Sequence, residues 1–213
     1  MSELSEQERQ RRNSLEELRK LNIDPYPAEG YEVNTTTTEI LEHYDEEKGN
    51  FRSVSLAGRM MNRRVMGNAS FAELQDEKGR IQIYVKRDNI CPGEDKTYYN
   101  KVFKKLLDIG DIIGVKGSVF KTKVGEISIN VEEFIVLSKS LKPLPIVKEK
   151  DGQVYDAFTD PEQRYRQRYL DLIVNQSSKD VFIQRTRLIQ SMRSFLNEQG
   201  YLEVETPILQ PIY

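Results

Sequence analysis

The sequence predicts a mainly β domain with some α structure, flanked by helical segments, and three observations predict it. From Val54 onward, five segments alternate apolar and polar residues with period two, as half-buried strands do. One segment of helical period follows the third of them, and turn-forming residues separate the others. The resulting order, β-β-β-α-β-β over about 85 residues, is the connectivity of a five-stranded OB-fold barrel.

The composition excludes several classes of site. The chain of 213 residues is 38% hydrophobic and 31% charged, so it can bury a core and is too apolar to be disordered throughout. Cys91 is the only cysteine and His43 the only histidine. These single residues exclude disulfides, Cys/His zinc sites and a histidine-based catalytic triad. The sequence therefore offers no candidate catalytic residue and no candidate metal ligands.

Targeting signals and charge limit the choice of partner. No apolar run approaches the length of a membrane span, and the first residues lack the apolar core of a secretory signal. We therefore expect a cytoplasmic protein with no membrane partner. The net charge is −2, but residues 1–50 carry 6 basic and 13 acidic side chains, whereas residues 51–140 carry 16 and 11. The positive middle of the chain is the part that favours a polyanionic partner.

Residues 1–50 are expected to form a helical N-terminal segment. A thin apolar stripe predicts one helix over the first 22 residues, and Ser14 with Glu17 fits a capping box. The stripe consists of Leu15, Leu18 and Leu21. The threonine run 35–38 predicts the start of a second short helix, with Thr38 as its cap.

Residues 51–145 are expected to form the OB-fold domain. The predicted strands lie at 54–66, 70–76, 79–87, 111–123 and 126–137, with one helix within 96–110. This helix places five apolar residues on one side and stops at Gly110. The five residues are Tyr99, Val102, Phe103, Leu106 and Leu107.

Residues 146–213 are expected to form a hinge and the incomplete start of a second domain. A connector rich in Pro and Lys sets the domain boundary near residue 145. A helical period runs through 160–175, and a second helix follows the serine pair 177–178, which we expect to cap it. The stretch YLEVETPIL then alternates like a strand that Pro207 interrupts. These elements cannot complete a core, so we expect a truncated α/β domain.

Alternation within the predicted strands places polar and aromatic side chains on the outer face of the barrel. The strand that buries Ala72 and Leu74 must turn Phe71 outward. The next strand turns Gln82 outward, and the last hairpin carries Glu126 at its mouth. An outward ring can stack an unpaired base for ~1–3 kcal/mol, and amide and carboxylate groups can read base edges. We interpret this face as a site for single-stranded nucleic acid.

Basic residues support the same interpretation. We expect Arg63 on the first strand and Arg80 on the third to lie near this face, where they would hold phosphates. Arg59 and Arg64 add charge to the surface. In an alternative interpretation, Phe71 caps the barrel beneath a loop, and the polar residues only face water.

Two further hypotheses belong to other functional classes. The barrel could be a stand-alone module that binds single-stranded nucleic acid without base preference. Alternatively, the role is structural, and apolar residues of the segment 141–213 drive assembly. These apolar residues include Met192, Phe195, Val204 and Ile208.

Several motifs also resemble those of the lysyl-tRNA synthetase family, of bacterial type, from about Leu15 onward. AGRMMNRRVMGNASFAELQDEKGRIQIYV is similar to that family's anticodon-binding barrel. LRKLNIDPYP, LKPLP and RYRQRYLDLI resemble its entry segment and interdomain hinge, and FLNEQGYLEVETPIL resembles motif 1 of class II synthetases. Aspartyl and asparaginyl relatives share the barrel, whereas the combination of these motifs is typical of the lysine enzymes.

The resemblance implies that the anticodon stem-loop of tRNA(Lys) is the partner. Carried over by position, it implies that Phe71 stacks on the middle anticodon base, that Gln82 and Glu126 read that base, and that Arg63 and Arg80 make further contacts. Lysine anticodons are rich in uridine, which suits a pyrimidine-sized site with amide and carboxylate groups.

The resemblance also implies an enzyme that uses ATP and Mg²⁺ to form lysyl-adenylate and then transfers lysine to tRNA(Lys). Within these 213 residues we expect no cofactor, because motifs 2 and 3, which hold ATP in the family, are absent. We therefore expect no synthetase activity from this chain alone. Motif 1 implies a homodimer, with Pro207 at the position of its hallmark proline and Phe195 in the same dimer-forming element.

Overall fold

The structure, a computed structural model, describes residues 4–145, 148–150, 153–155 and 158–207. The chain divides into two compact units, which we call the barrel unit (1–143) and the helical unit (144–213). The N-terminal segment therefore belongs to the same unit as the barrel. In the described parts of the chain, every helix is too short or too polar to cross a membrane.

The first helix, α1 (Glu6–Lys20), begins at Ser5 and not near Ser14, so the predicted capping box was wrong. The Glu8 N–H donates to the Ser5 hydroxyl, and the Ser5 N–H donates to the Glu8 carboxylate. These two bonds satisfy donors that a helix leaves unpaired at its start. Ser14 lies instead within the helix on its buried side, next to Leu15.

A second short helix, α2 (Thr37–His43), forms where the threonine run predicted one. Its cap is Thr36 rather than Thr38, because the Thr36 hydroxyl accepts from the Glu39 N–H and the Glu39 carboxylate accepts from the Thr36 N–H. Asp76 anchors this end of the helix to the barrel by accepting from the N–H and the hydroxyl of Thr37.

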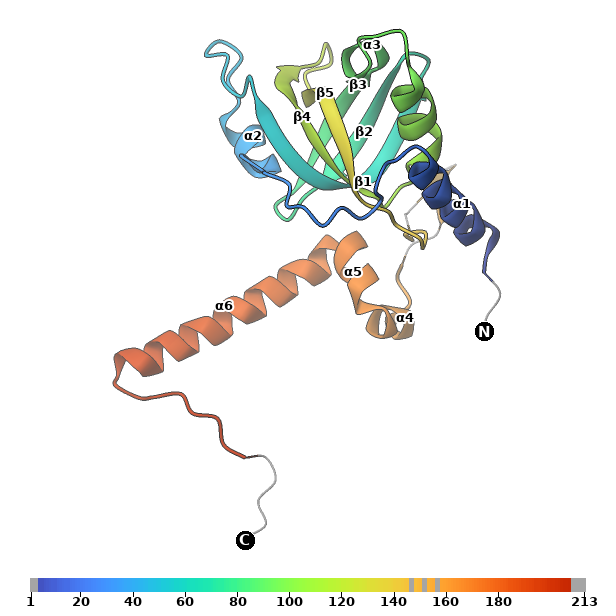
Figure 1. Ribbon diagram of the computed structural model, residues 1–213. Helices are drawn as coiled ribbons and strands as arrows, with labels where there is room; N and C mark the ends of the chain where they lie inside the picture. The colour runs from blue at the N-terminus through green and yellow to red at the C-terminus, as the bar shows by residue number, and fades with distance from the viewer. Residues whose placement is uncertain (1–3, 146–147, 151–152, 156–157, 208–213) are drawn as a thin grey trace. The chain divides into compact units, whose positions relative to one another are not determined.

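Five strands form a closed barrel, as the alternation predicted (Figure 1). They are β1 (Val54–Met66), β2 (Ala69–Gln75), β3 (Arg80–Lys86), β4 (Ile112–Lys121) and β5 (Ile127–Ser138). The order around the barrel is β1-β2-β3-β5-β4, in which β3 and β5 are parallel and the other neighbours antiparallel. Closure therefore brings β3 and β5, which are far apart in the sequence, side by side.

The barrel interior holds the apolar residues that alternation assigned to it. Leu74 of β2 and Ile83 of β3 are fully buried, while their neighbours along each strand point outward. Between β3 and β4 lie α3 (Arg87–Ile90) and a π-helix, η1 (Tyr98–Leu106). The five apolar residues predicted to share one side of this helix are all buried. Helix α1 packs against η1 at the edge of the barrel (Figure 1).

Strand β1 contains a β-bulge between Met60 and Asn62. Met60 and Met61 are both buried, so the alternation of faces shifts by one residue beyond this point. After the bulge, Asn62 and Arg64 are exposed and pair with outward-facing positions of β2, whereas Arg63 turns to the other side. The bulge thus decides which arginine of β1 reaches the outer face.

The helical unit begins with a hairpin of two short antiparallel strands, β6 (Lys148–Lys150) and β7 (Gln153–Tyr155). Three helices follow among its described residues: α4 (Pro161–Arg166), α5 (Arg168–Val174) and α6 (Gln176–Glu198). The single helix predicted over 160–175 is therefore two helices, because the backbone at Gln167 leaves the helical region, with φ −120° and ψ 54°. The serine pair 177–178 lies inside the first turn of α6, so its predicted capping role was wrong.

A buried carboxylate joins these three helices. Asp171 of α5 is fully buried, and its Oδ1 accepts from Arg164 Nε (2.8 Å) and from Asn175 Nδ2 (2.7 Å). Arg168 donates to the other oxygen of the same carboxylate. Arg164 also donates to the Ser178 hydroxyl at 2.7 Å, which ties α4 to α6. A buried charge with this many donors is well compensated.

Residues 201–207 form no strand, so this part of the prediction was wrong. A strand needs a partner for its ladder hydrogen bonds, and none of the described strands pairs with this stretch. Pro207 is exposed, and the side chain of Phe195 in α6 is 61% exposed. Ile208 and the residues after it lie outside the described part of the chain.

Candidate nucleic-acid interface

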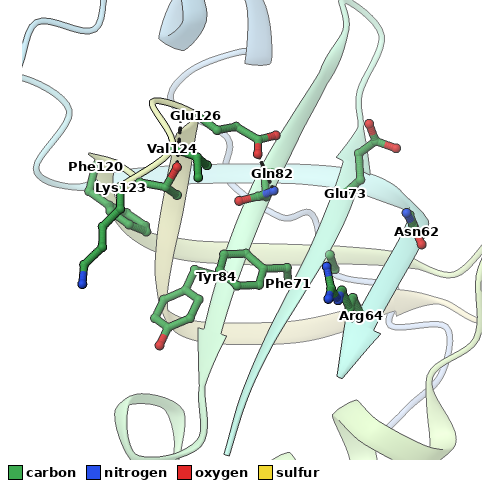
Figure 2. A pocket seen from close by; sticks show the side chains of 12 residues that line it. Asn62, Arg64, Phe71, Glu73, Gln82, Tyr84, Phe120, Lys123, Val124 and Glu126 are labelled. Carbon is green, nitrogen blue, oxygen red and sulfur yellow. Dashed lines mark hydrogen bonds between the residues drawn. The ribbon is translucent and has the colours of Figure 1, made fainter. Parts of the chain in front are cut away.

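A groove of about 810 Å³ lies on the outer face of the barrel (Figure 2). Its lining comes from β1, β2, β3, the end of β4 and the loop that joins β4 to β5. Phe71, Gln82 and Glu126, which the sequence placed on one face, all line this groove. The β2–β3 hairpin and the segment around Glu126, which are distant in the sequence, therefore meet at one concave surface.

Strand register explains how these residues come together. Phe71 of β2 pairs with Tyr84 of β3, and Glu73 pairs with Gln82. Gln82 in turn pairs with Ser128 of β5 across the parallel contact. Because paired positions point to the same side of a sheet, the outer face carries two neighbouring rows. One row is aromatic, with Phe71 and Tyr84, and the other is polar, with Glu73, Gln82 and Ser128.

The aromatic row is extended by a third ring. The ring centroids of Phe71 and Tyr84 lie 5.0 Å apart with an interplanar angle of 43°, and Phe120 of β4 lies 6.0 Å from Tyr84 at 64°. All three side chains are partly exposed and line the groove. Partly exposed rings offer apolar surface on which a flat aromatic ligand can stack.

The Gln82 side chain is held at both ends of its amide. Its Nε2 donates to Glu126 Oε2 at 2.7 Å, and its Oε1 accepts from Ser128 Oγ at 2.9 Å. Figure 2 shows the amide of Gln82 and the carboxylate of Glu126 next to each other, joined by this hydrogen bond. An amide has two N–H groups and a carboxylate has four acceptor positions, so both groups keep capacity for a ligand.

The hairpin between β4 and β5 positions Glu126. The Glu126 N–H donates to Thr122 Oγ1 (3.0 Å), and the Glu126 carbonyl accepts from the Thr122 N–H (2.9 Å). Gly125 has a φ of 90°, which favours glycine, and its N–H donates to the Thr122 carbonyl at 2.8 Å. This tight loop turns the Glu126 side chain toward Gln82.

Arg63 does not line the groove. Its Nη1 donates to the carbonyls of Phe103 (2.5 Å) and Leu107 (2.9 Å) at the end of η1. Burial lowers the pKa of this guanidinium, and the nearby Asp108 carboxylate opposes that shift. The β-bulge explains the position of Arg63, because it shifts the alternation of faces along β1 beyond Met60. In the structure Arg63 caps a helix C-terminus.

Arg80 lies beside the groove rather than in its lining. Its Nε donates to Gln75 Oε1 at 2.8 Å, and its Nη1 lies 3.4 Å from Oε2 of Glu73, which does line the groove. Arg59 is turned away, since its Nη1 donates to the Gly110 carbonyl at 2.7 Å. Of the four arginines expected near this face, Arg80 therefore stays close to it through its contact with Glu73, and Arg64 lines the groove itself.

Several residues of the groove were not singled out from the sequence as site residues. They include Asn62, Phe120, Thr122, Lys123 and Val124. Arg64, which was expected to add charge to this surface, pairs with Phe71 in the β1–β2 register and lines the groove. In Figure 2, Arg64 and Lys123 lie on opposite sides of the aromatic rings. Cations on both sides of a stacking surface suit the two phosphates that flank an unpaired nucleotide.

Within the described ranges, no three or more His, Cys, Asp or Glu side chains are grouped so that they could hold a metal ion. What the groove offers is stacking surface, fixed hydrogen-bonding groups and positive charge, which together are the features of a single-stranded nucleic-acid site.

Two family models match the chain. Residues 54–137 match the OB-fold nucleic acid binding domain of the tRNA anticodon type, and residues 160–213 match the class II tRNA synthetases (D, K and N). The first match covers β1 to β4 and all but the last residue of β5, and therefore the whole groove.

The chain is also similar to several lysine–tRNA ligases. It is 63% identical to that of Porphyromonas gingivalis (strain ATCC 33277) over 99% of this chain and 36% of that protein. It is 59% identical to that of Azobacteroides pseudotrichonymphae over 98% and 42%, and 57% identical to that of Christiangramia forsetii over 100% and 37%. The chain thus spans about two fifths of the length of these relatives. Together, the two family matches and the identity along the whole chain show that its two parts are similar to the OB-fold domain and to the class II tRNA synthetases (D, K and N), and that the chain as a whole is similar to the lysine–tRNA ligases.

Proposed function

We propose that the groove binds the anticodon stem-loop of tRNA(Lys), and that the chain is the N-terminal region of an enzyme that charges this tRNA with lysine. The observation that carries the proposal is the presence of Phe71, Gln82 and Glu126 in one groove. An OB-fold binds oligonucleotides on its second and third strands, which are the strands that supply Phe71 and Gln82. The similarity to lysine–tRNA ligases supports lysine as the amino acid.

In this proposal the middle anticodon base stacks on Phe71. Stacking on an aromatic side chain contributes ~1–3 kcal/mol and accepts any base. Arg64 and Lys123 contact the phosphates on either side of the stacked nucleotide, which makes binding weaker at high salt. These groups supply affinity, and base choice comes from the polar row.

Gln82 and Glu126 choose the base through the order of donors and acceptors along its edge. Uracil presents a carbonyl, an N–H and a second carbonyl, whereas cytosine presents an amino group, a bare ring nitrogen and a carbonyl. A carboxylate opposite the ring nitrogen accepts a hydrogen bond from uracil and is repelled by the lone pair of cytosine. The free N–H of the Gln82 amide then donates to the adjacent carbonyl of uracil. This arrangement favours uridine at the stacked position.

The remaining roles are proposed from the similarity to the class II tRNA synthetases. We propose that the whole enzyme uses ATP and Mg²⁺, and that it is a homodimer in which motif 1, with Phe195 and Pro207, contributes to the interface. The exposure of the apolar side chains along α6 supports an interface there. No step of the ATP chemistry is assigned to the described residues.

The alternative of a stand-alone module without base preference is not favoured. Such a module needs only rings and cations, whereas this groove also holds an amide fixed against a carboxylate. The match of residues 160–213 to a synthetase domain also favours the enzyme over the module.

Binding to two stem-loops tests the proposal. Labelled stem-loops with the tRNA(Lys) anticodon, and with its middle uridine replaced by cytidine, are titrated with the chain at one moderate salt concentration. We expect the uridine stem-loop to bind about tenfold tighter or more, since a mismatched base typically costs ~1–3 kcal/mol. Equal affinities would contradict the decoding role, and the absence of binding to either stem-loop would contradict the groove as an RNA site.

A further inference from the structure

We propose that Ser128 is a positioning residue that fixes the orientation of the Gln82 amide, and that it thereby determines the discrimination between uracil and cytosine. The inference rests on the proposed function of the groove and deepens it. Ser128 pairs with Gln82 across the parallel contact of β3 and β5. Its side chain is fully buried, and its Oγ donates to Gln82 Oε1 at 2.9 Å.

Burial separates the role of Ser128 from that of a ligand contact. Ser128 is not part of the groove lining, so it acts on a bound base only through Gln82. The two groups that hold the Gln82 amide differ in their surroundings. Glu126 is exposed on the hairpin, where water competes for its hydrogen bonds, whereas the Ser128 hydroxyl is shielded from water. The bond from Ser128 is therefore the more persistent constraint on the amide.

The orientation matters because the two ends of an amide have similar shapes and opposite hydrogen-bonding roles. With Oε1 held by Ser128, the N–H groups of Gln82 point toward Glu126 and the groove. A reversed amide would offer the base an acceptor where uracil needs a donor, and this acceptor suits the amino group of cytosine. A fixed amide thus distinguishes the order of donors and acceptors on uracil from that on cytosine. A mobile amide can bind either base.

Removal of the hydroxyl has a defined consequence. In Ser128→Ala, Oε1 of Gln82 loses its buried donor, and the amide is held only through the exposed Glu126 side chain. The backbone pairing of β3 with β5 does not depend on this hydroxyl. Gln82 then samples other orientations, which weakens uracil binding and relieves the penalty against cytosine.

The test measures the ratio of affinities for the uridine and cytidine stem-loops in the wild-type chain and in Ser128→Ala. We expect the ratio to fall ~3- to 10-fold, which is the range that corresponds to one neutral hydrogen bond. Ser128→Cys keeps a side chain of similar size with a weak donor, and it should also lower the ratio. This second variant preserves the test if the alanine variant does not fold. An unchanged ratio in folded Ser128→Ala or Ser128→Cys would overturn the inference.

Ser70→Ala is the matched control. Ser70 of β2 is also fully buried, and its hydroxyl lies 2.8 Å from the Tyr99 hydroxyl, away from the groove lining. We expect this variant to lower the melting temperature and to leave the affinity ratio unchanged. A ratio that falls equally in both serine variants would mean that loss of barrel stability, and not the orientation of Gln82, is the cause.

A double-mutant cycle with Gln82→Ala completes the test. In the Gln82→Ala background, Ser128→Ala should not change the ratio further, because the group through which it acts is gone. A further fall in that background would contradict the inference. The outcomes separate the two proposals: a wild-type chain without base preference contradicts the decoding function itself, whereas a uridine preference that survives Ser128→Ala contradicts only the role of Ser128.

Discussion

Gln82 Nε2 lies 2.7 Å from Glu126 Oε2, although 44 positions separate the two residues in the sequence. The contact depends on two features of the barrel. The parallel pairing of β3 with β5 brings the segments together, and the tight loop at Gly125 turns the carboxylate back toward β3. An amide and a carboxylate in fixed contact therefore form a polar pair next to the Phe71 ring.

Replacing Phe71 by alanine is expected to weaken binding of the tRNA(Lys) stem-loop by ~1–3 kcal/mol, because the ring supplies the stacking surface. The fold should persist, since Phe71 lies on the outer face and is not part of the buried core. Calorimetric titration measures the first effect and thermal unfolding the second.

Phe103→Ala serves as the control for the same change in the core. Phe103 is fully buried in η1, with its ring centroid 5.5 Å from that of Phe134. Loss of such a ring typically destabilises a protein by ~3–5 kcal/mol. If Phe71→Ala lowered the free energy of unfolding as much as Phe103→Ala, the ring would be a cap on the barrel and not a binding surface.

Glu126→Gln is expected to reduce the preference for uridine over cytidine about tenfold. The substitution keeps the size of the side chain but introduces N–H groups, and these can donate to the bare ring nitrogen of cytosine. Competition between the two stem-loops measures the preference. Glu133→Gln removes the same charge from β5 outside the groove lining, where Glu133 lies 3.6 Å from Lys116, and should leave the preference intact. An equal fall in both variants would point to net charge rather than to base reading.

Arg63 and Arg64 are adjacent in the sequence and are expected to have opposite roles. Arg64→Met should reduce the salt dependence of stem-loop binding by about one phosphate contact, a change of ~0.7 in the slope of log K against log salt. Arg63→Met removes two hydrogen bonds to carbonyls of η1 and should lower the free energy of unfolding by ~1–3 kcal/mol with little change in that slope. Affinities at several salt concentrations and denaturant unfolding measure the two effects. The reverse assignment of effects would show that the bulge does not orient these side chains as described.

The strands of the barrel could be predicted because alternation is a local property of each strand. Each strand buries every second residue, so the outward positions of Phe71 and Gln82 followed from the burial of Ala72 and Ile83. The side of Arg63 could not be predicted in this way. It depends on the bulge at Met60, which arises from the pairing of β1 with β2 and leaves no signal in the composition.

Helix caps and buried hydrogen bonds could not be predicted from the sequence either, because they depend on how distant segments pack. Ser5–Glu8 and Ser14–Glu17 have the same spacing in the sequence, and packing of the helix against the barrel decides that Ser14 is buried and Ser5 is the cap. Ser128 is a further case. Its bond to Gln82 exists only because the barrel closes through β3 and β5, which are far apart in the sequence.

Glu17 links α1 to η1. We expect its contribution to the stability of the protein to decrease in acid. Its carboxylate accepts from Lys20 Nζ at 2.7 Å and from Lys101 Nζ of η1 at 2.9 Å. These two hydrogen bonds lower the pKa of Glu17 from 4.5 to about 2. Because the folded pKa lies below the unfolded value, the contribution of Glu17 to stability is present above pH 4.5 and is lost as the pH falls toward about 2.

Lys101→Met tests this link, because it removes the cation that η1 contributes and leaves Lys20 in place. We expect the pKa of Glu17 to rise toward 4.5, as measured by an NMR titration of its side-chain carboxyl. Lys105→Met removes an equal charge from an exposed position of the same helix and should leave the pKa of Glu17 low. A Glu17 titration that is the same in Lys101→Met and in the wild-type chain would mean that Lys20 alone lowers the pKa, and that the contact between α1 and η1 rests on apolar packing.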